Sequence, residues 1–202
     1  MMHLEFGGAR IPVRAGETII GSAPGCAIML EGEGILLIDD EPVVRETLQL
    51  LLQDLPEAWL MNNEGPETWS PYDVVGHLIE GEETDWIPRA KIILEQGEAR
   101  PFDRFDRFAM FEKSKGKTIA ELLDTFARLR AESLRELEML NLTPELLEKR
   151  GTHPVLGVVT MKQLMASWVV HDLGHIRQIV RTMAKQYRDE IGPWTEFLSI
   201  VN

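Results

Sequence analysis

The spacing of apolar residues changes at about residue 40. In residues 1–40, short apolar runs alternate with polar residues and are separated by glycine and proline. From residue 41 onward, apolar residues recur at steps of three and four, which is the period of one face of an α-helix. The pattern therefore predicts a short β-rich leader over 1–40, followed by a helical domain over 41–202.

The leader begins with the pattern of a β-hairpin. Leu4 and Phe6 alternate with polar positions, and Ile11 and Val13 do the same on the other side of Gly7-Gly8. Two glycines suit a two-residue turn because they readily adopt positive φ values. Three further short apolar runs predict strands at residues 18–20, 27–30 and 35–38.

The helical domain shows clear start signals. The sharpest is Ser70, which suits the N-cap position, followed by Pro71 at the first helical position and Asp73 at the third. We expect a long ordered loop over 96–117 and another loop at 153–157, where glycine and proline interrupt the period. The signals predict helices that begin after Asp40, Ser70, Thr118, Thr143 and Thr160, the last running to about Lys185. Four of these are long, so the predicted fold is mainly α, a four-helix bundle with a small N-terminal β appendage.

Composition and charge narrow the function classes. The 202 residues include 33 acids and 21 bases, a formal net charge of −12, which disfavours nucleic-acid binding through a broad basic face. The single cysteine, Cys26, excludes an internal disulfide and fits a reducing compartment. No apolar run approaches the ~18 residues of a membrane span, and the N-terminus does not resemble a signal peptide. We therefore expect a cytoplasmic protein with neither a nucleic-acid nor a membrane partner.

Three of the five histidines suggest a metal site. His171 and His175 are four residues apart in the last predicted helix, so both imidazoles leave the same helix face one turn apart. Two neutral imidazoles so placed can bind one transition metal, although surface or core positions are the alternative. His77 lies on the apolar face of an earlier predicted helix. It is either a third ligand or a buried core histidine.

Several neighbours of these histidines are candidates for the same site. Glu80 is a candidate base, with a solvated acidic face as the alternative. Gly81 either leaves space above His77 or serves helix packing. Gln178 either lines the cavity and holds a ring or makes an interhelical hydrogen bond. Trp168 is expected to pack beside the site.

The predicted 96–117 loop carries an aromatic run with arginines inside it. The phenylalanines at 102, 105, 108 and 111 either wall a pocket or cover one end of the bundle. Arg104 and Arg107 are candidates for contact with an anionic substrate, and surface ion pairs are the alternative.

Two segments together are similar to a known family. Trp69-Ser70-Pro71-Tyr72-Asp73-Val74-Val75-Gly76-His77-Leu78-Ile79 and His171-Asp172-Leu173-Gly174-His175-Ile176-Arg177-Gln178 resemble the two signatures of the DinB/YfiT-like family. The resemblance covers roughly residues 42–200. It implies a four-helix bundle with a divalent metal held by His77, His171 and His175. It also implies membership of a group that includes thiol-dependent transferases and isomerases, and hence a low-molecular-weight thiol as a second candidate cofactor.

The leader carries a second, shorter resemblance. Gly16 to Ser22 and Gly25 to Leu30 are similar to the opening strands of forkhead-associated domains, which bind phosphothreonine. The match covers about 25 residues, and Ser22 stands where a basic residue is usual. We therefore expect a β appendage that packs on the bundle or takes part in dimer contacts.

These observations predict a metal-dependent enzyme that activates water or a thiol for hydrolysis or transfer to a small-molecule substrate. The candidates for the ion are zinc, nickel, iron and manganese, because imidazole ligands alone do not choose among such metals. We expect a homodimer. Two alternatives stay open, a metal-binding stress-associated protein without turnover and an interaction module.

Overall fold

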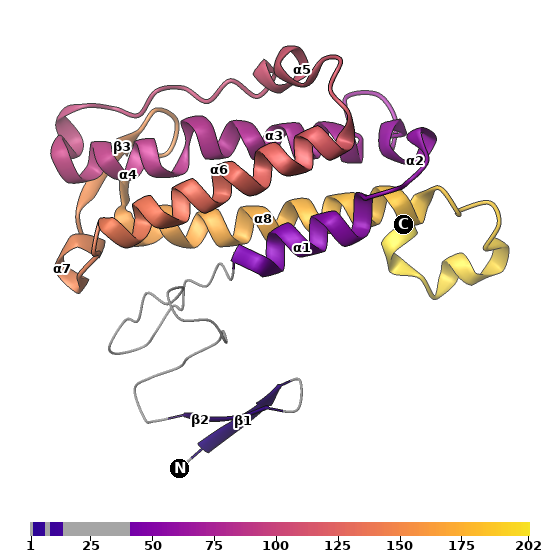
Figure 1. Ribbon diagram of the computed structural model, residues 1–202, viewed down its shortest axis with the longest axis horizontal. Coiled ribbons are helices and arrows are strands. Elements are labelled where there is room, and N and C mark those ends of the chain that lie inside the picture. The colour runs from indigo at the N-terminus through magenta and orange to yellow at the C-terminus, as the bar shows by residue number, and fades with distance from the viewer. Residues whose placement is uncertain (1, 7–8, 14–40) are drawn as a thin grey trace.

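The computed structural model describes residues 2–6, 9–13 and 41–202. Helices dominate the described chain (Figure 1), and no described helix is both long and apolar enough to cross a bilayer. The elements are β1 (Met2–Phe6), β2 (Ala9–Val13), α1 (Glu41–Leu52), α2 (Glu57–Met61), α3 (Pro71–Thr84), α4 (Trp86–Glu95), η1 (Gly97–Ala99), α5 (Ala109–Ser114), α6 (Ile119–Met139), α7 (Pro144–Leu147), β3 (Arg150–His153), β4 (Gly157–Thr160), α8 (Met161–Lys185), η2 (Gly192–Glu196) and η3 (Ser199–Val201).

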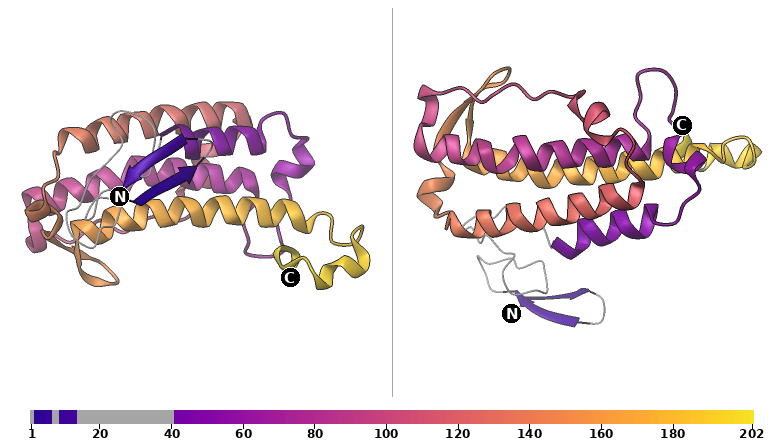
Figure 2. Two further views of the ribbon diagram at one scale, coloured as in Figure 1. Left: turned by 90° about the horizontal axis from the view of Figure 1, so that it is seen from below. Right: turned by 45° about the horizontal axis from the view of Figure 1, so that its top comes forward.

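Four long helical segments form the predicted bundle. They are α1, α6, α8 and the pair α3–α4, in which α4 continues the direction of α3 (Figures 1 and 2). Helix α6 packs against α1, α3 and α4, and α8 packs against the same three helices. The short α5 lies on α3. The prediction of a mainly α, four-helix bundle is confirmed.

The predicted cap residues begin the helices. Ser70, Thr118 and Thr160 each accept a hydrogen bond from the backbone N–H three residues later, and the side chain at that third position bonds back to the cap residue. These reciprocal bonds satisfy N–H groups that the helix itself leaves without partners. Helix α8 ends at Lys185, as predicted.

Two segments predicted as loops contain regular structure. The 96–117 segment holds η1 and α5, and the 153–157 region joins β3 to β4 in an antiparallel hairpin with His153 opposite Gly157. The Nδ1 atom of His153 accepts from the N–H groups of Val155 and Leu156 at 3.1 Å, which closes the turn locally. The prediction of a plain loop at 153–157 missed these strands because four-residue strands carry too few positions to show a period.

The N-terminal hairpin is confirmed. Strands β1 and β2 pair antiparallel, with Phe6 opposite Ala9 across a two-residue connection. The strands predicted at 18–20, 27–30 and 35–38, the cap predicted at Asp40 and the forkhead-like stretch over 16–30 lie outside the described residues.

The bundle core has two apolar clusters separated by a polar layer. One cluster joins α1, α2, the first half of α3 and α6, and Ile179 of α8. The other joins α4, Phe102, Leu147 and the first half of α8. Between the clusters along their helices lie buried polar residues, namely Glu82 on α3, Arg130 on α6 and Asp172 on α8, and the buried His77 lies at the edge of this layer, among the α3 residues of the first cluster. This polar layer contains the candidate site.

Gly151 should be intolerant of a side chain. A Cβ atom there would lie 2.8 Å from Ile93 Cγ1 and from Phe102 Cε1, inside the second apolar cluster. We expect Gly151→Ala to lower the free energy of unfolding by about 1–3 kcal/mol, since overpacking displaces core side chains. Gly174→Ala is the control, because no atom lies within 4 Å of its Cβ position in α8, and it should raise stability slightly. Urea denaturation of both variants measures the difference, and equal stabilities would contradict the overpacking.

Candidate metal centre

Three imidazoles meet in the polar layer. The Nε2 atom of His171 lies 3.1 Å from Nε2 of His77 and 3.1 Å from Nε2 of His175. One ring nitrogen from each histidine lies within 4.8 Å of the other two. His77 is buried, and the other two are half-buried. Helix α3 thus brings His77, which is 94 positions before His171 in the sequence, against the pair of histidines on α8.

The arrangement fits a transition-metal ion. Imidazole nitrogens bind zinc at about 2.0–2.1 Å, so two of them on one ion lie about 3.0 Å apart at a right angle and about 3.4 Å apart at the tetrahedral angle. The observed separations of 3.1 Å fall inside that interval. Without an ion, three converging imidazoles have at most one N–H per neutral ring to share among them. The donor set therefore suits a divalent ion with open coordination positions.

The second nitrogen of two rings has a partner. Nδ1 of His175 lies 2.9 Å from Oε1 of Gln178, so we assign the proton to Nδ1 and the lone pair to Nε2. Nδ1 of His171 lies 3.5 Å from Oδ1 of Asp172. This long contact likewise orients the His171 ring with its Nε2 atom toward the other imidazoles. Nδ1 of His77 is buried without a hydrogen-bond partner among the described residues. Gln178 thus holds a ring, one of the two predicted roles.

Aromatic rings surround the imidazoles. Trp69 packs on His77 at a centroid distance of 4.7 Å, and Phe105 meets the same ring edge-on at 5.3 Å. On the other side, Trp86 meets His171 edge-on at 5.0 Å. Such a shell limits water access and lowers the local dielectric constant. One of the predicted phenylalanines, Phe105, therefore does wall the site.

Trp168 and Gly81 act on the site through Trp86. The Trp168 ring is buried and stacks on Trp86 at 5.6 Å. A Cβ atom on Gly81 would lie 3.2 Å from Nε1 of Trp86, so glycine leaves room for that indole rather than for a ligand. Both residues therefore lie behind Trp86, and the space beside Gly81 is taken by that indole.

Glu80 points toward α5. Its buried carboxylate pairs with Lys113, which also bonds Glu83 at 2.7 Å. No contact joins Glu80 to the three imidazoles within the described chain. Its role as a base stays a prediction.

A buried ion-pair network adjoins the histidines. Arg130 is fully buried and bonds Glu82 at 2.9 Å and Asp172 at 2.7 Å, and both carboxylates are buried with it. The guanidinium also lies 5.1 Å from the centre of the Trp168 ring. Since Asp172 contacts His171, the network links α6 to the candidate metal centre.

Burial makes the imidazoles weakly basic. Burial, and then the neighbouring imidazoles, lower the pKa of His77 to about 3, and burial and His171 lower that of His175 to about 4. Both rings are therefore neutral near pH 7, the form that binds a metal.

The metal-free protein should lose stability between about pH 6.5 and pH 4. An unfolded histidine has a pKa of about 6.5, so in this window the unfolded state binds more protons than the folded state. Each such histidine then contributes a slope of up to about 1.4 kcal/mol per pH unit, which vanishes above about pH 6.5. Urea denaturation in chelator from pH 7.5 to 4.5 measures the slope. His77→Gln should reduce it, and equal slopes would contradict the lowered pKa.

Sequence reasoning did not assign Trp69, Trp86 or Arg130 to the site. Trp69 precedes the helix cap and is not in helical phase with His77, so periodicity does not indicate its contact. Trp86 follows the break between α3 and α4. Arg130 lies on α6 among charged residues. The one signal of its burial in the sequence is that it stands in the apolar phase of this helix, four residues after Phe126.

Comparisons with known proteins agree with this geometry. The sequence model of the DinB superfamily matches residues 43–179, a range that includes all three histidines. Among solved structures, the chain is similar to YfiT from Bacillus subtilis, described as a probable metal-dependent hydrolase with an unusual four-helix bundle topology. The TM-score is 0.62 at 21% identity, over 72% of this chain and 82% of that one, so the likeness shows a shared fold. No curated protein matches the chain.

Proposed function

The chain belongs to the DinB superfamily, and on that premise we propose that it is a metal-dependent hydrolase whose divalent ion is held by His77, His171 and His175. The observation that carries the proposal is the convergence of three imidazoles within 4.8 Å. The likeness to YfiT, itself described as a probable metal-dependent hydrolase, supports the same reaction class.

A divalent ion in such a site supplies activation of water or of a thiol, because coordination lowers their pKa toward neutrality. The protein's own residues prepare the site. Gln178 and Asp172 hold two of the rings from behind, and Trp69, Trp86 and Phe105 exclude water around them. The three ligands leave coordination positions for water and substrate, as catalytic sites do.

Two finer assignments belong to the proposal. We keep a low-molecular-weight thiol as an alternative nucleophile to water, which would make the protein a transferase. We keep Glu80 as a candidate base, although its carboxylate pairs with Lys113, so it would have to leave that lysine to accept a proton. The pairing favours a second candidate function, metal binding without turnover.

The test combines metal content with hydrolysis. Protein expressed with ample metal should contain about one equivalent of a divalent transition metal. A panel of esters, amides and phosphoesters, with and without added thiol, should reveal turnover that stops in chelator and returns with metal. Less than ~0.2 equivalents of metal would reject the site, since three imidazoles should hold an ion well. Bound metal without turnover would favour the second candidate, and Glu80→Gln tests the base.

A further inference from the structure

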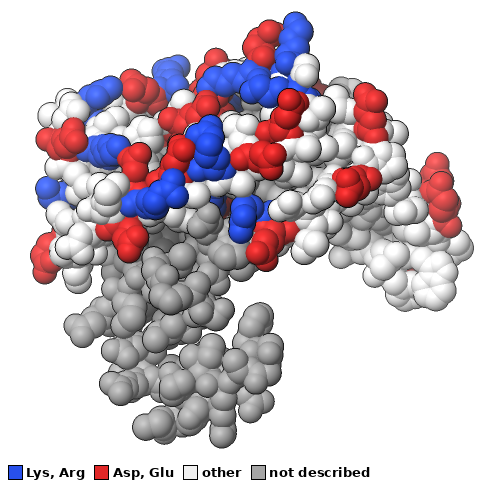
Figure 3. Space-filling model, in the orientation of Figure 1, with Lys and Arg blue, Asp and Glu red and all other residues white. Residues whose placement is uncertain are grey.

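None of the three histidines lies on α6, yet one side chain of this helix reaches the metal centre. On the face of the molecule in Figure 3, lysine and arginine side chains lie at the surface beside acidic ones, whereas Arg130 is fully buried. Its Nη2 atom donates to Oδ2 of Asp172 at 2.7 Å, and its Nε atom donates to Oε1 of Glu82 at 3.0 Å. A buried cation is tolerated only where its partners are well placed, so these bonds define the position of the Asp172 carboxylate.

The Asp172 carboxylate needs such a partner in order to face His171. The two residues are neighbours on α8, and neighbouring side chains on an α-helix point about 100° apart rather than toward each other. Oδ1 of Asp172 nevertheless lies 3.5 Å from Nδ1 of His171, while Arg130 bonds Oδ2 of the same carboxylate. The guanidinium therefore sets the direction in which this carboxylate is turned, and the carboxylate faces the Nδ1 side of the imidazole.

A second path leads from the same guanidinium to the same imidazole. The guanidinium carbon lies 5.1 Å from the centre of the Trp168 ring, and Trp168 stacks on Trp86 at 5.6 Å with the two planes 7° apart. Trp86 in turn meets His171 edge-on at 5.0 Å. Arg130 thus supports two neighbours of His171, the carboxylate beside Nδ1 and the indole against the ring.

The other two histidines are held differently. Nδ1 of His175 lies 2.9 Å from Oε1 of Gln178, which is one turn away on the same helix. Nδ1 of His77 has no hydrogen-bond partner among the described residues. Of the three imidazoles, His171 is therefore the one whose Nδ1 contact leads to a different helix in the described structure.

We propose that Arg130 is a positioning residue of the metal centre, which holds Asp172 and packs on Trp168 so that His171 presents Nε2 to the ion. The inference rests on the metal site of the proposed function. Groups that hold a metal ligand from behind change metal affinity by about 10–100-fold when they are substituted. Helix α6 thus contributes to the affinity for the ion although it supplies no histidine to the cluster.

Zinc affinity, measured by calorimetry on the full chain, tests the proposal. Arg130→Lys keeps the positive charge but lacks the planar fork that bonds two carboxylates, so it should bind zinc about tenfold less tightly than wild type. Asp172→Asn should show a similar loss. In the double variant the combined loss should stay well below the product of the single losses, because Arg130 acts through Asp172. Wild-type affinity in Arg130→Lys, or a combined loss equal to that product, would overturn the inference.

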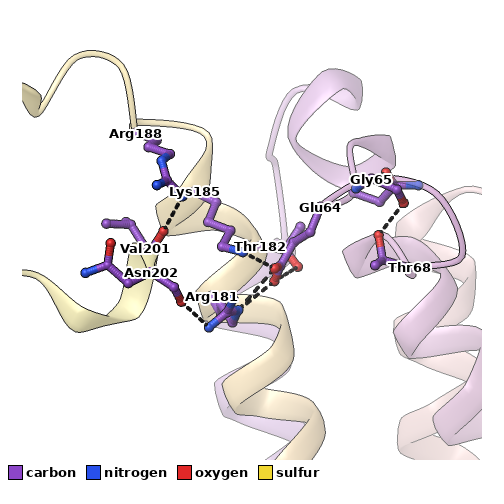
Figure 4. Close-up of polar contacts among 10 residues, drawn as sticks. Glu64, Gly65, Thr68, Arg181, Thr182, Lys185, Arg188, Val201 and Asn202 are labelled. Carbon is purple, nitrogen blue, oxygen red and sulfur yellow. Dashed lines mark hydrogen bonds and ion pairs between the residues drawn. The ribbon is translucent and has the colours of Figure 1, made fainter. Parts of the chain in front are cut away.

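The ion pairs of Glu64 provide the matched control. Glu64 precedes α3, accepts from Arg181 of α8 at 3.1 Å and also bonds Lys185, so it ties α8 to a neighbouring segment as Arg130 does (Figure 4). Within the described residues, no contact joins Glu64 to the three histidines. Glu64→Gln should therefore bind zinc like wild type, and so should Gly151→Ala, whose substitution lies in the second apolar cluster. An equal loss in either control would attribute the effect to general destabilisation and would overturn the inference.

The tautomer of His171 gives a readout that needs no metal. Because a carboxylate faces Nδ1, the ring should carry its proton on Nδ1 in metal-free wild type, and long-range proton–nitrogen NMR of the imidazoles shows which nitrogen is protonated. Arg130→Lys and Asp172→Asn should increase the share of the Nε2–H tautomer. A wild-type His171 protonated on Nε2, or an unchanged tautomer in both variants, would overturn the inference. The expected tautomers in a protein that binds no zinc would support the inference and reject the proposed function.

Wild-type protein also supplies a test that does not require any variant to fold. The Nε–H signal of Arg130 should shift when zinc is added, because the ion fixes His171 and with it Asp172. The signal of Arg128, which is exposed on the same helix, should stay in place. An unshifted Arg130 signal in zinc-loaded protein would overturn the inference.

Discussion

Replacing His77 with alanine is expected to abolish most of the stabilisation that bound metal confers on the fold. His171 and His175 share α8, so their mutual geometry depends on one helix, whereas packing of α3 must bring His77 to them. A ligand that binds only the folded state stabilises it by RT ln(1 + [M]/Kd), about 2.7 kcal/mol at a hundred times Kd. With two ligands left, the affinity falls and this gain falls with it.

The metal-free variant should be nearly as stable as metal-free wild type. Nδ1 of His77 is buried without a hydrogen-bond partner among the described residues, and the three rings compete for the same protons. In the metal-free protein the His77 imidazole therefore contributes little to the free energy of unfolding. Thermal melts of both proteins in chelator and in zinc measure the effect. His153→Gln is the control, since His153 lies on β3 and should lower stability equally in both conditions. An equal loss in both conditions for His77→Ala would identify His77 as a packing residue.

Replacing Arg130 with alanine should lower the free energy of unfolding by about 3–5 kcal/mol. Arg130 is fully buried between the carboxylates of Glu82 and Asp172, so its removal leaves two buried charges without their main partner. Arg128→Ala is the matched control. Arg128 lies on the same helix and pairs with Glu132 at an exposed position, where an ion pair contributes about 0.5 kcal/mol or less.

The loss at Arg130 should depend on pH in a way that a packing defect would not. Burial raises the pKa of Glu82, and removing the neighbouring cation raises it further, so the variant can neutralise this carboxyl by protonation in mild acid. The difference in unfolding free energy between wild type and Arg130→Met should therefore be smaller at pH 5 than at pH 8. Urea denaturation of both proteins at pH 5 and at pH 8 measures this difference in unfolding free energy. A difference that does not change with pH would indicate lost packing alone.

Much of the local structure could be predicted from the sequence because its causes are local. Ser70, Thr118 and Thr160 begin their helices through bonds to residues three positions away, and those partners are visible in the sequence. The four-residue step between His171 and His175 likewise places two imidazoles together by helix geometry alone. The hairpin at 150–160 was missed because its strands are short and its turn depends on the ring of His153.

By itself the sequence determined the long helices, the residues at which α3, α6 and α8 begin, and that α8 presents two imidazoles on one face. Only the tertiary structure decided that His77 joins them, that Arg130 is buried while Arg128 on the same helix is exposed, and that Trp69 and Arg107 lie beside the site. The physical reason is sequence separation. A cap or a helical pair involves residues within one turn, whereas His77 meets His171 across 94 positions through the packing of two helices that no local pattern specifies.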